Sequence, residues 1–265
     1  MDEKETPSAR SEYAVHTSKL CRVFGNLRAV EELDLRVESG TLYGFLGRNG
    51  AGKSTTIKML TGILAPSSGS ISLLGANPSN EAEAAEVRRR IGVVPEDLAL
   101  FELLTGREYL DFVGTIYLLD DAVARERVDE LFEVLIVGAE EMQLLLDYSH
   151  GMRKKLALAA ALIGDPSLLF LDEPFEGVDA VSSRVMRDIL VRFVDRGGTV
   201  FITSHVLDVI ERLCTHVGII DRGRLVYEAP LSSLAGRTLE SVFIERVGDT
   251  DGMRGDLRWL REDGV

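Results

Sequence analysis

Short apolar runs alternate along this chain with longer segments whose apolar residues recur at helical spacing. Five of the runs predict β-strands, at residues 41–46, 91–94, 168–171, 199–203 and 217–221. Residues 180–195 place apolar side chains three to five positions apart, which predicts an amphipathic helix ended by Gly197 and Gly198. This alternation is typical of an α/β fold with a mostly parallel central sheet and helices on its faces.

The middle and the two ends of the chain differ from this pattern. Residues 96–162 carry few strand signals, and we expect an inserted helical lobe there. One face of that lobe repeats Val128, Leu131, Phe132 and Leu135. We expect polar residues 1–12 to form a flexible N-terminal tail without a secretory signal, and residues 229–265 to form a C-terminal extension and tail.

Charge and cysteine content narrow the function classes. A net charge of -13 would repel nucleic acid over most of the surface. The basic clusters at residues 88–90 and 153–155 are interpreted as solvated helix faces. Cys21 and Cys214 lack the close spacing of a zinc site, so we interpret them as reduced thiols. No apolar stretch approaches the roughly 20 residues that span a bilayer. We therefore expect a cytoplasmic protein without a nucleic-acid partner.

A glycine-rich phosphate loop follows the first predicted strand of the central sheet. It reads Gly47-Arg48-Asn49-Gly50-Ala51-Gly52-Lys53-Ser54-Thr55. Its glycines let backbone N–H groups approach the phosphates of a nucleotide, and the helix that follows adds its N-terminal dipole. We expect Lys53 to neutralise the β- and γ-phosphates, Ser54 to bind Mg²⁺, and Thr55 to help at the α-phosphate.

The predicted strand at residues 168–171 ends in two carboxylates, Asp172 and Glu173. Ligands of an open α/β sheet bind at the carboxyl ends of its strands. We expect Asp172 to hold Mg²⁺, directly or through water, and Glu173 to orient and deprotonate the attacking water. Taken alone, the pair is equally consistent with a strand end that meets solvent.

A third motif lies between these two, in the run Tyr148-Ser149-His150-Gly151-Met152. The order of phosphate loop, Ser-X-Gly element, Asp-Glu-Pro and a later histidine resembles the ATP-binding cassette (ABC) family over residues 13–228. The resemblance implies a P-loop NTPase (RecA-like) core, an N-terminal antiparallel β subdomain and the inserted helical lobe. The chain departs from the family's Leu-Ser-Gly-Gly-Gln, with His150 for the central glycine and Met152 for glutamine.

The resemblance also implies roles for single residues. Ser149 and Gly151 would contact the γ-phosphate of ATP bound to the opposite subunit of a head-to-tail dimer. Phe24 would stack on adenine, although a place in the core is equally open. Asp179 would lie in the loop that meets the partner subunit, and it can also cap the following helix. His205 would hydrogen-bond the γ-phosphate.

Glu96 stands where the family usually has glutamine. Its carboxylate still supplies an oxygen to Mg²⁺ or water. Three features together are similar to those of ATPase subunits that pair with exporter-type permeases. They are this glutamate, the Tyr-Ser-His-Gly-Met form at residues 148–152 and the run Leu103-Leu104-Thr105-Gly106-Arg107-Glu108.

The expected function is that of an ATP-binding and hydrolysing subunit of an ABC transporter, with ATP and Mg²⁺ as cofactors and Lys53, Glu173 and His205 as catalytic residues. Its partners would be a second ATPase subunit, identical or different, and a separate transmembrane permease. Contact with the membrane would come through that permease, at the inner face of the cell membrane. The alternative is a soluble ABC ATPase acting on a cytosolic assembly, for example in iron–sulfur cluster assembly.

Overall fold

A six-stranded, mostly parallel sheet forms the centre of the computed structural model, which describes residues 11–136 and 139–248. Its strands lie in the order β10-β9-β4-β8-β7-β6. Five of them are parallel to one another, and β10 pairs with β9 in the antiparallel sense. Their bounds are β4 Leu42–Leu46, β6 Ile91–Val94, β7 Leu168–Asp172, β8 Thr199–Ser204, β9 His216–Asp221 and β10 Arg224–Pro230.

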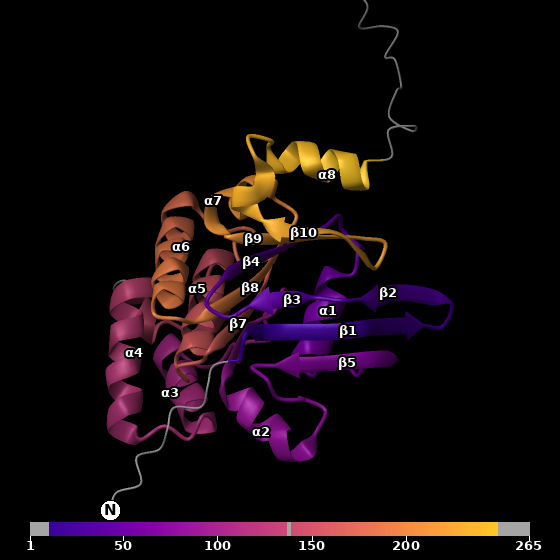
Figure 1. Ribbon diagram of the computed structural model, residues 1–265. Helices are drawn as coiled ribbons and strands as arrows, with labels where there is room; N and C mark the ends of the chain where they lie inside the picture. The colour runs from indigo at the N-terminus through magenta and orange to yellow at the C-terminus, as the bar shows by residue number, and fades with distance from the viewer. Residues whose placement is uncertain (1–10, 137–138, 249–265) are drawn as a thin grey trace, which may run out of the picture.

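A second, antiparallel sheet lies against the first (Figure 1). Its long strand β1 pairs with three others; the bounds are β1 Tyr13–Phe24, β2 Leu27–Leu33, β3 Arg36–Glu38 and β5 Ser68–Leu73. The predicted N-terminal antiparallel subdomain is therefore confirmed.

Helices fill the intervals between the parallel strands and build the predicted helical lobe. Figure 1 places α3 and α4 on the side of the molecule away from the antiparallel sheet. The helices are α1 Lys53–Leu60, α2 Glu81–Arg89, α3 Gly106–Ile116, α4 Asp121–Leu135, α5 His150–Leu162, α6 Ala180–Asp195, α7 Leu207–Leu213 and α8 Leu239–Val247. Thr105 starts α3 with a reciprocal capping box to Glu108, which satisfies two of the N–H groups left free at a helix start.

Successive side chains along each strand point to opposite faces of the central sheet, so the core is divided between these two faces. Leu42 and Leu46 pack on the side of α5, α6 and α7, whereas Tyr43 and Phe45 pack toward the antiparallel sheet and α1. Phe201 continues the second layer, with its ring centroid 5.3 Å from that of Phe45. The central strands are thus buried on both faces, as expected for parallel strands between two layers.

The segment that follows β10 is folded onto the domain. The sequence pattern predicted only an extension there, yet a 3-10 turn at Leu231–Leu234 leads to α8. Leu239 and Val242 of α8 are buried in the same core as Leu213 of α7. Predicted tail residues 1–10 and 249–265 lie outside the described residues. Among the helices that the structure describes, none is both long and apolar enough to cross a membrane.

Candidate functional site

Parallel pairing gathers the predicted motifs at one edge of the central sheet. The last residues of β4 and β8, Leu46 and Ser204, lie opposite each other, and Asp172 at the end of β7 lies opposite Thr203. The phosphate loop leaves β4, Glu173 follows β7, and His205 follows β8. Because parallel strands end at the same edge, three segments far apart in sequence meet there.

The phosphate loop depends on glycine for its path and for its close packing. Gly52 has φ +111°, and a Cβ at this position would lie 2.6 Å from the carbonyl oxygen of Ala29. A Cβ on Gly47 would lie 2.5 Å from the carbonyl oxygen of Ile220. The loop leads into α1, whose first turn contains no acidic residue and whose N-cap, Gly52, provides no side-chain cap. The N–H groups at this helix start therefore suit a bound phosphate.

Lys53 points its buried ammonium back into the loop. Its Nζ donates a hydrogen bond to the carbonyl oxygen of Gly47 at 2.9 Å and lies 3.4 Å from Oε1 of Glu173. Only 6% of Lys53 is exposed. A nucleotide phosphate is the kind of anion that would satisfy the rest of this buried cation.

Glu173 adopts a left-handed backbone conformation, with φ +48°. Its N–H donates to Oγ1 of Thr203 at 3.0 Å, and its Oε2 lies 3.0 Å from Nδ1 of His205. Its Oε1 is buried and accepts no hydrogen bond from the described residues. The Lys53 ammonium forms an ion pair with this oxygen but does not hydrogen-bond to it. A buried oxygen left without a hydrogen bond is available to a water or substrate group.

Hard oxygen ligands lie next to this carboxylate. Ser54 Oγ donates to Oε2 of Glu96 at 3.0 Å, and Thr203 donates its hydroxyl proton to Oδ1 of Asp172. Burial raises the pKa of Asp172, while hydrogen bonds from Thr203 and Ser54 oppose the rise. The described residues hold no cluster of three His, Cys, Asp or Glu that would bind a metal alone. A hydroxyl and two carboxylates nevertheless suit Mg²⁺, which is commonly bound through one or two carboxylates together with substrate phosphates.

The other predicted residues take no part in these hydrogen bonds and ion pairs. Ser149 caps α5, its Oγ accepting from the N–H of Met152 at 3.2 Å, and Asp179 caps α6 through the N–H groups of residues 181 and 182. The two caps are neighbours, because a Cβ on Gly177 would meet Cδ2 of His150 at 2.7 Å. In the described part of the chain, the capping hydrogen bonds of both residues go to their own helices and not to the phosphate loop.

Phe24, at the end of β1, has 44% of its surface exposed, so the alternative of a core position is wrong. The guanidinium of Arg22 lies 4.5 Å from the centroid of its ring.

Sequence reasoning missed two residues of this region. Thr203 hydrogen-bonds both Asp172 and Glu173, although the sequence marks it only as a strand residue. Lys154 was interpreted as part of a solvated basic face, and this was wrong, because only 1% of it is exposed. One signal in the sequence pointed to burial of Lys154. This residue lies four residues before Leu158, so the two share one face of α5, and Leu158 is fully buried. The other basic cluster, residues 88–90, is solvent-exposed as expected.

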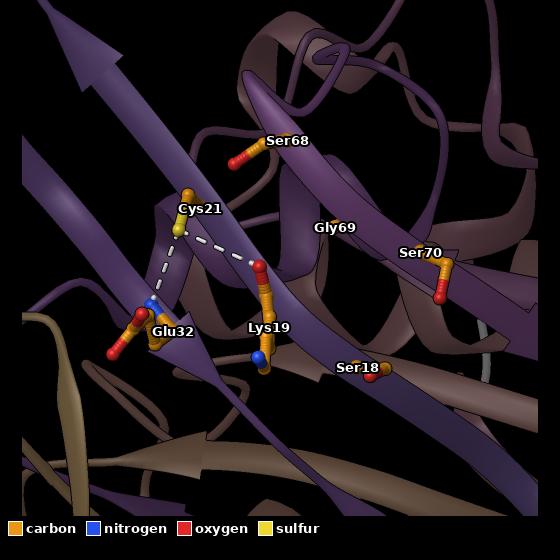
Figure 2. A pocket seen from close by; sticks show the side chains of 7 residues that line it. All are labelled: Ser18, Lys19, Cys21, Glu32, Ser68, Gly69 and Ser70. Atoms are coloured by element: carbon orange, nitrogen blue, oxygen red, sulfur yellow. Dashed lines mark hydrogen bonds between the residues drawn. The ribbon is translucent and has the colours of Figure 1, made fainter.

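A separate, open pocket of about 430 Å³ lies on the antiparallel sheet (Figure 2). Within it, Sγ of Cys21 accepts from the N–H of Glu32 at 3.2 Å and lies 3.5 Å from the carbonyl oxygen of Lys19. Cys21 and Cys214 are free thiols, and burial raises the pKa of Cys214. The residues lining this pocket include none of the predicted nucleotide-binding residues.

The phosphate loop, buried lysine and acidic strand end define a P-loop nucleotide-hydrolysing site. The model of the ABC transporter family matches residues 30–176. The daunorubicin/doxorubicin resistance ATP-binding protein DrrA of Streptomyces peucetius is 40% identical over 236 residues, which cover 89% of this chain and 71% of that protein. The bacitracin transport ATP-binding protein BcrA of Bacillus licheniformis is 38% identical over 224 residues, 84% of this chain and 72% of BcrA.

A solved ATP-binding subunit of an ABC transporter superposes with a TM-score of 0.81 at 26% identity, covering 88% of this chain and 98% of that one. The chain belongs to the ABC transporter family. It is an ATP-binding subunit that hydrolyses ATP, as the sequence predicted.

Proposed function

We propose that the chain hydrolyses ATP with Glu173 as the general base, in a site that a second ATPase subunit completes. The observation that carries the proposal is the buried, hydrogen-bond-free Oε1 of Glu173, 3.4 Å from the ammonium of Lys53. That oxygen is suited to accept a proton from water beside the γ-phosphate. Lys53 would hold the β- and γ-phosphates, with Asn49, Gly50, Ala51 and Thr55 of the loop around them.

His205 contributes orientation and a donor. Its Nδ1 lies 3.0 Å from Oε2 of Glu173, which leaves the other ring nitrogen to face the γ-phosphate. This contact, together with the hydrogen bond that the backbone N–H of His205 donates to the same Oε2 at 3.4 Å, would fix the rotation of the carboxylate, so that Oε1 is directed to the water. Lys53, Glu173 and His205 form the proposed catalytic set.

Ser54, Asp172 and Glu96 are the proposed ligands of Mg²⁺. When bound, the ion would offset the negative charge of the β- and γ-phosphate oxygens. The hydrogen bond between Ser54 and Glu96 brings a hydroxyl and a carboxylate together without the ion. Asp172 completes the set from the end of β7, held by the hydroxyl of Thr203.

A head-to-tail dimer gives a function to the residues that do not reach the phosphate loop of their own chain. Ser149 and His150 are exposed at the start of α5, and Asp179 is exposed at the start of α6. In the proposed dimer, Ser149 and Gly151 approach the γ-phosphate held by the other subunit, and Asp179 lies at the interface. Adenine would stack on the exposed ring of Phe24.

The membrane partner is proposed to be an exporter-type permease, because the chain is similar to a drug-resistance ATP-binding protein and to a bacitracin transport ATP-binding protein. The helical lobe exposes several large apolar side chains to receive it; these are Phe101, Leu103, Phe112, Ile116 and Leu118. The subunit would then lie at the cytoplasmic face of the membrane, bound only through the permease. Residues 13–228 are proposed as the ATPase domain, followed by the extension that carries α8.

A mixing experiment tests the shared site. Ser149→Arg should leave each chain able to bind ATP, because the serine acts on nucleotide held by the other subunit. Lys53→Ala should lose ATP binding, because the phosphates lose their buried counter-charge. Each variant alone should be inactive in phosphate release. A mixture should recover activity, since each mixed dimer contains one site with an intact loop and an intact serine.

The mixing experiment has a matched control. Arg153→Ala alters a neighbouring basic residue of α5 but keeps the loop and Ser149, so unlike Ser149→Arg it should be active in phosphate release on its own. If the Ser149→Arg and Lys53→Ala mixture stays inactive while both variants remain folded, the shared site is wrong.

A further inference from the structure

Lys154 is a charged residue inside the protein. It lies on α5, five positions after the capping Ser149, and it is among the largest fully buried side chains. Lysine is almost never buried without partners, because an unpaired ammonium loses its hydration at a large cost in free energy. What surrounds its Nζ therefore has to explain why it is there.

The ammonium bridges two segments of the ATPase site. Nζ donates to the backbone carbonyl oxygen of Glu96 at 3.2 Å and to that of Glu173 at 3.3 Å. Burial lowers the pKa of Lys154, and the nearby carboxylates of Glu176, Asp172, Glu96 and Glu173 act in the opposite direction. One side chain of α5 thus joins the second residue after β6 to the residue after β7.

The backbone of Glu173 needs such support. Its φ of +48° is a conformation that costs a non-glycine residue about 1 kcal/mol or more. Thr203 holds the N–H of Glu173 from β8, and Lys154 holds its carbonyl group from α5. The two contacts fix the peptide groups on both sides of the strained residue, and with them the direction of its carboxylate.

We propose that Lys154 is a positioning residue for ATP hydrolysis, which holds Glu96 and Glu173 in fixed relation to α5. Because Ser149 starts the same helix, a displacement of α5 when Ser149 meets the partner's nucleotide reaches Glu173 through this ammonium. The residue touches neither substrate nor metal, and acts through the backbone of those that do. The inference rests on the proposed role of Glu173 as the base.

The first test is Lys154→Met, which keeps most of the length and the apolar character of the stem and removes the three donors. The matched control is Lys155→Met on the same helix; the Nζ of Lys155 pairs with Glu140 at 3.9 Å. Steady-state phosphate release gives kcat and KM, and thermal unfolding reports the fold. We expect kcat to fall at least tenfold for Lys154→Met with KM changed less than threefold, and Lys155→Met to keep both near parental values. An unchanged kcat for Lys154→Met overturns the proposal.

The second test separates positioning from general damage to the fold. Single-turnover hydrolysis is measured for Glu173→Gln with and without Lys154→Met. If Lys154 acts through Glu173, its loss changes the residual rate of Glu173→Gln by less than twofold, because that carboxylate is already gone. If Lys154→Met lowers the rate of Glu173→Gln by the same factor by which it lowers the rate of the parent, the positioning role is wrong. Near-parental hydrolysis by Glu173→Gln alone would instead refute the proposed base.

Lys154→Arg provides the test if the methionine variant does not fold. Its guanidinium keeps the charge and the donors, so we expect kcat between those of the parent and a variant without the charge, Lys154→Gln. The amide of glutamine is too short to bridge both carbonyl groups. Equal kcat for Lys154→Arg and Lys154→Gln would contradict the proposal.

Discussion

At the scale of single residues, the site is organised around one threonine. Thr203 donates its hydroxyl proton to Asp172 and accepts the N–H of Glu173, so it uses both capacities of its hydroxyl within the site. The threonine thereby holds the carboxylate proposed to bind metal and the backbone of the residue proposed as base. The arrangement leaves Asp172 buried as well as charged, and this has a cost in stability.

Asp172→Asn tests that cost. Because burial raises the pKa of Asp172, the folded chain binds this proton more readily than the unfolded chain does. The contribution of the group to stability is therefore present below its unfolded pKa and is lost as pH rises through the higher folded pKa. Replacing the charge should raise Tm at pH 7 in metal-free buffer by roughly 2–4 °C, and the gain should vanish near pH 4.

The same variant should lose MgATP hydrolysis, since the amide is a poorer ligand for Mg²⁺. Scanning calorimetry at the two pH values measures the first effect, and phosphate release measures the second. A lower Tm at pH 7 would show that the charge of Asp172 stabilises the fold, contrary to this expectation.

At the scale of elements, the site depends on how closely α5 approaches β6. A Cβ on Gly92 of β6 would lie 2.2 Å from the backbone oxygen of Ala161 in α5. A backbone atom cannot swing aside as a side chain can, so any side chain at Gly92 would push the helix away from the strand. The reach of Lys154 to the carbonyl group of Glu96 depends on this approach.

Gly92→Ala is therefore expected to destabilise the protein by about 1–3 kcal/mol and to lower ATP turnover. Gly114→Ala on α3 is the matched control, because its Cβ would make only ordinary contacts, the nearest at 3.4 Å from Cβ of Ala124. Alanine favours a helix over glycine by about 1 kcal/mol, so Tm should stay level or rise. Urea unfolding of both variants gives the comparison. Equal stability of the two variants would contradict the close-packing account.

The elements that sequence predicted well are those specified locally. Strand β6 and helix α6 have the predicted bounds, because apolar period and flanking glycine residues lie within each segment. Lys154 was misjudged because its two acceptors are backbone oxygens 58 and 19 positions away, which no local pattern reveals. The fold of α8 was missed for a related reason, since Leu239 and Val242 are buried by packing in the same core as distant residues such as Leu213 of α7.

At the scale of the whole molecule, the predicted site residues form two groups. The carboxyl edge of the central sheet brings the phosphate loop, Glu173 and His205 together in one chain. The helices on one face carry Ser149 and Asp179 at exposed starts, where their capping hydrogen bonds go to their own helices. In the proposed dimer, ATP itself joins these two groups, and closure depends on nucleotide.

The most direct test of this account is the state of Glu173→Gln with MgATP. The amide keeps the size of the side chain and removes the basic oxygen, so ATP should bind without being hydrolysed. Because bound ATP links the subunits, a closed dimer should accumulate. Size-exclusion chromatography with light scattering, run beside phosphate release, should give an inactive dimer with ATP and a monomer with ADP. A variant that hydrolyses ATP at the parental rate, or that stays monomeric with ATP, would contradict the account.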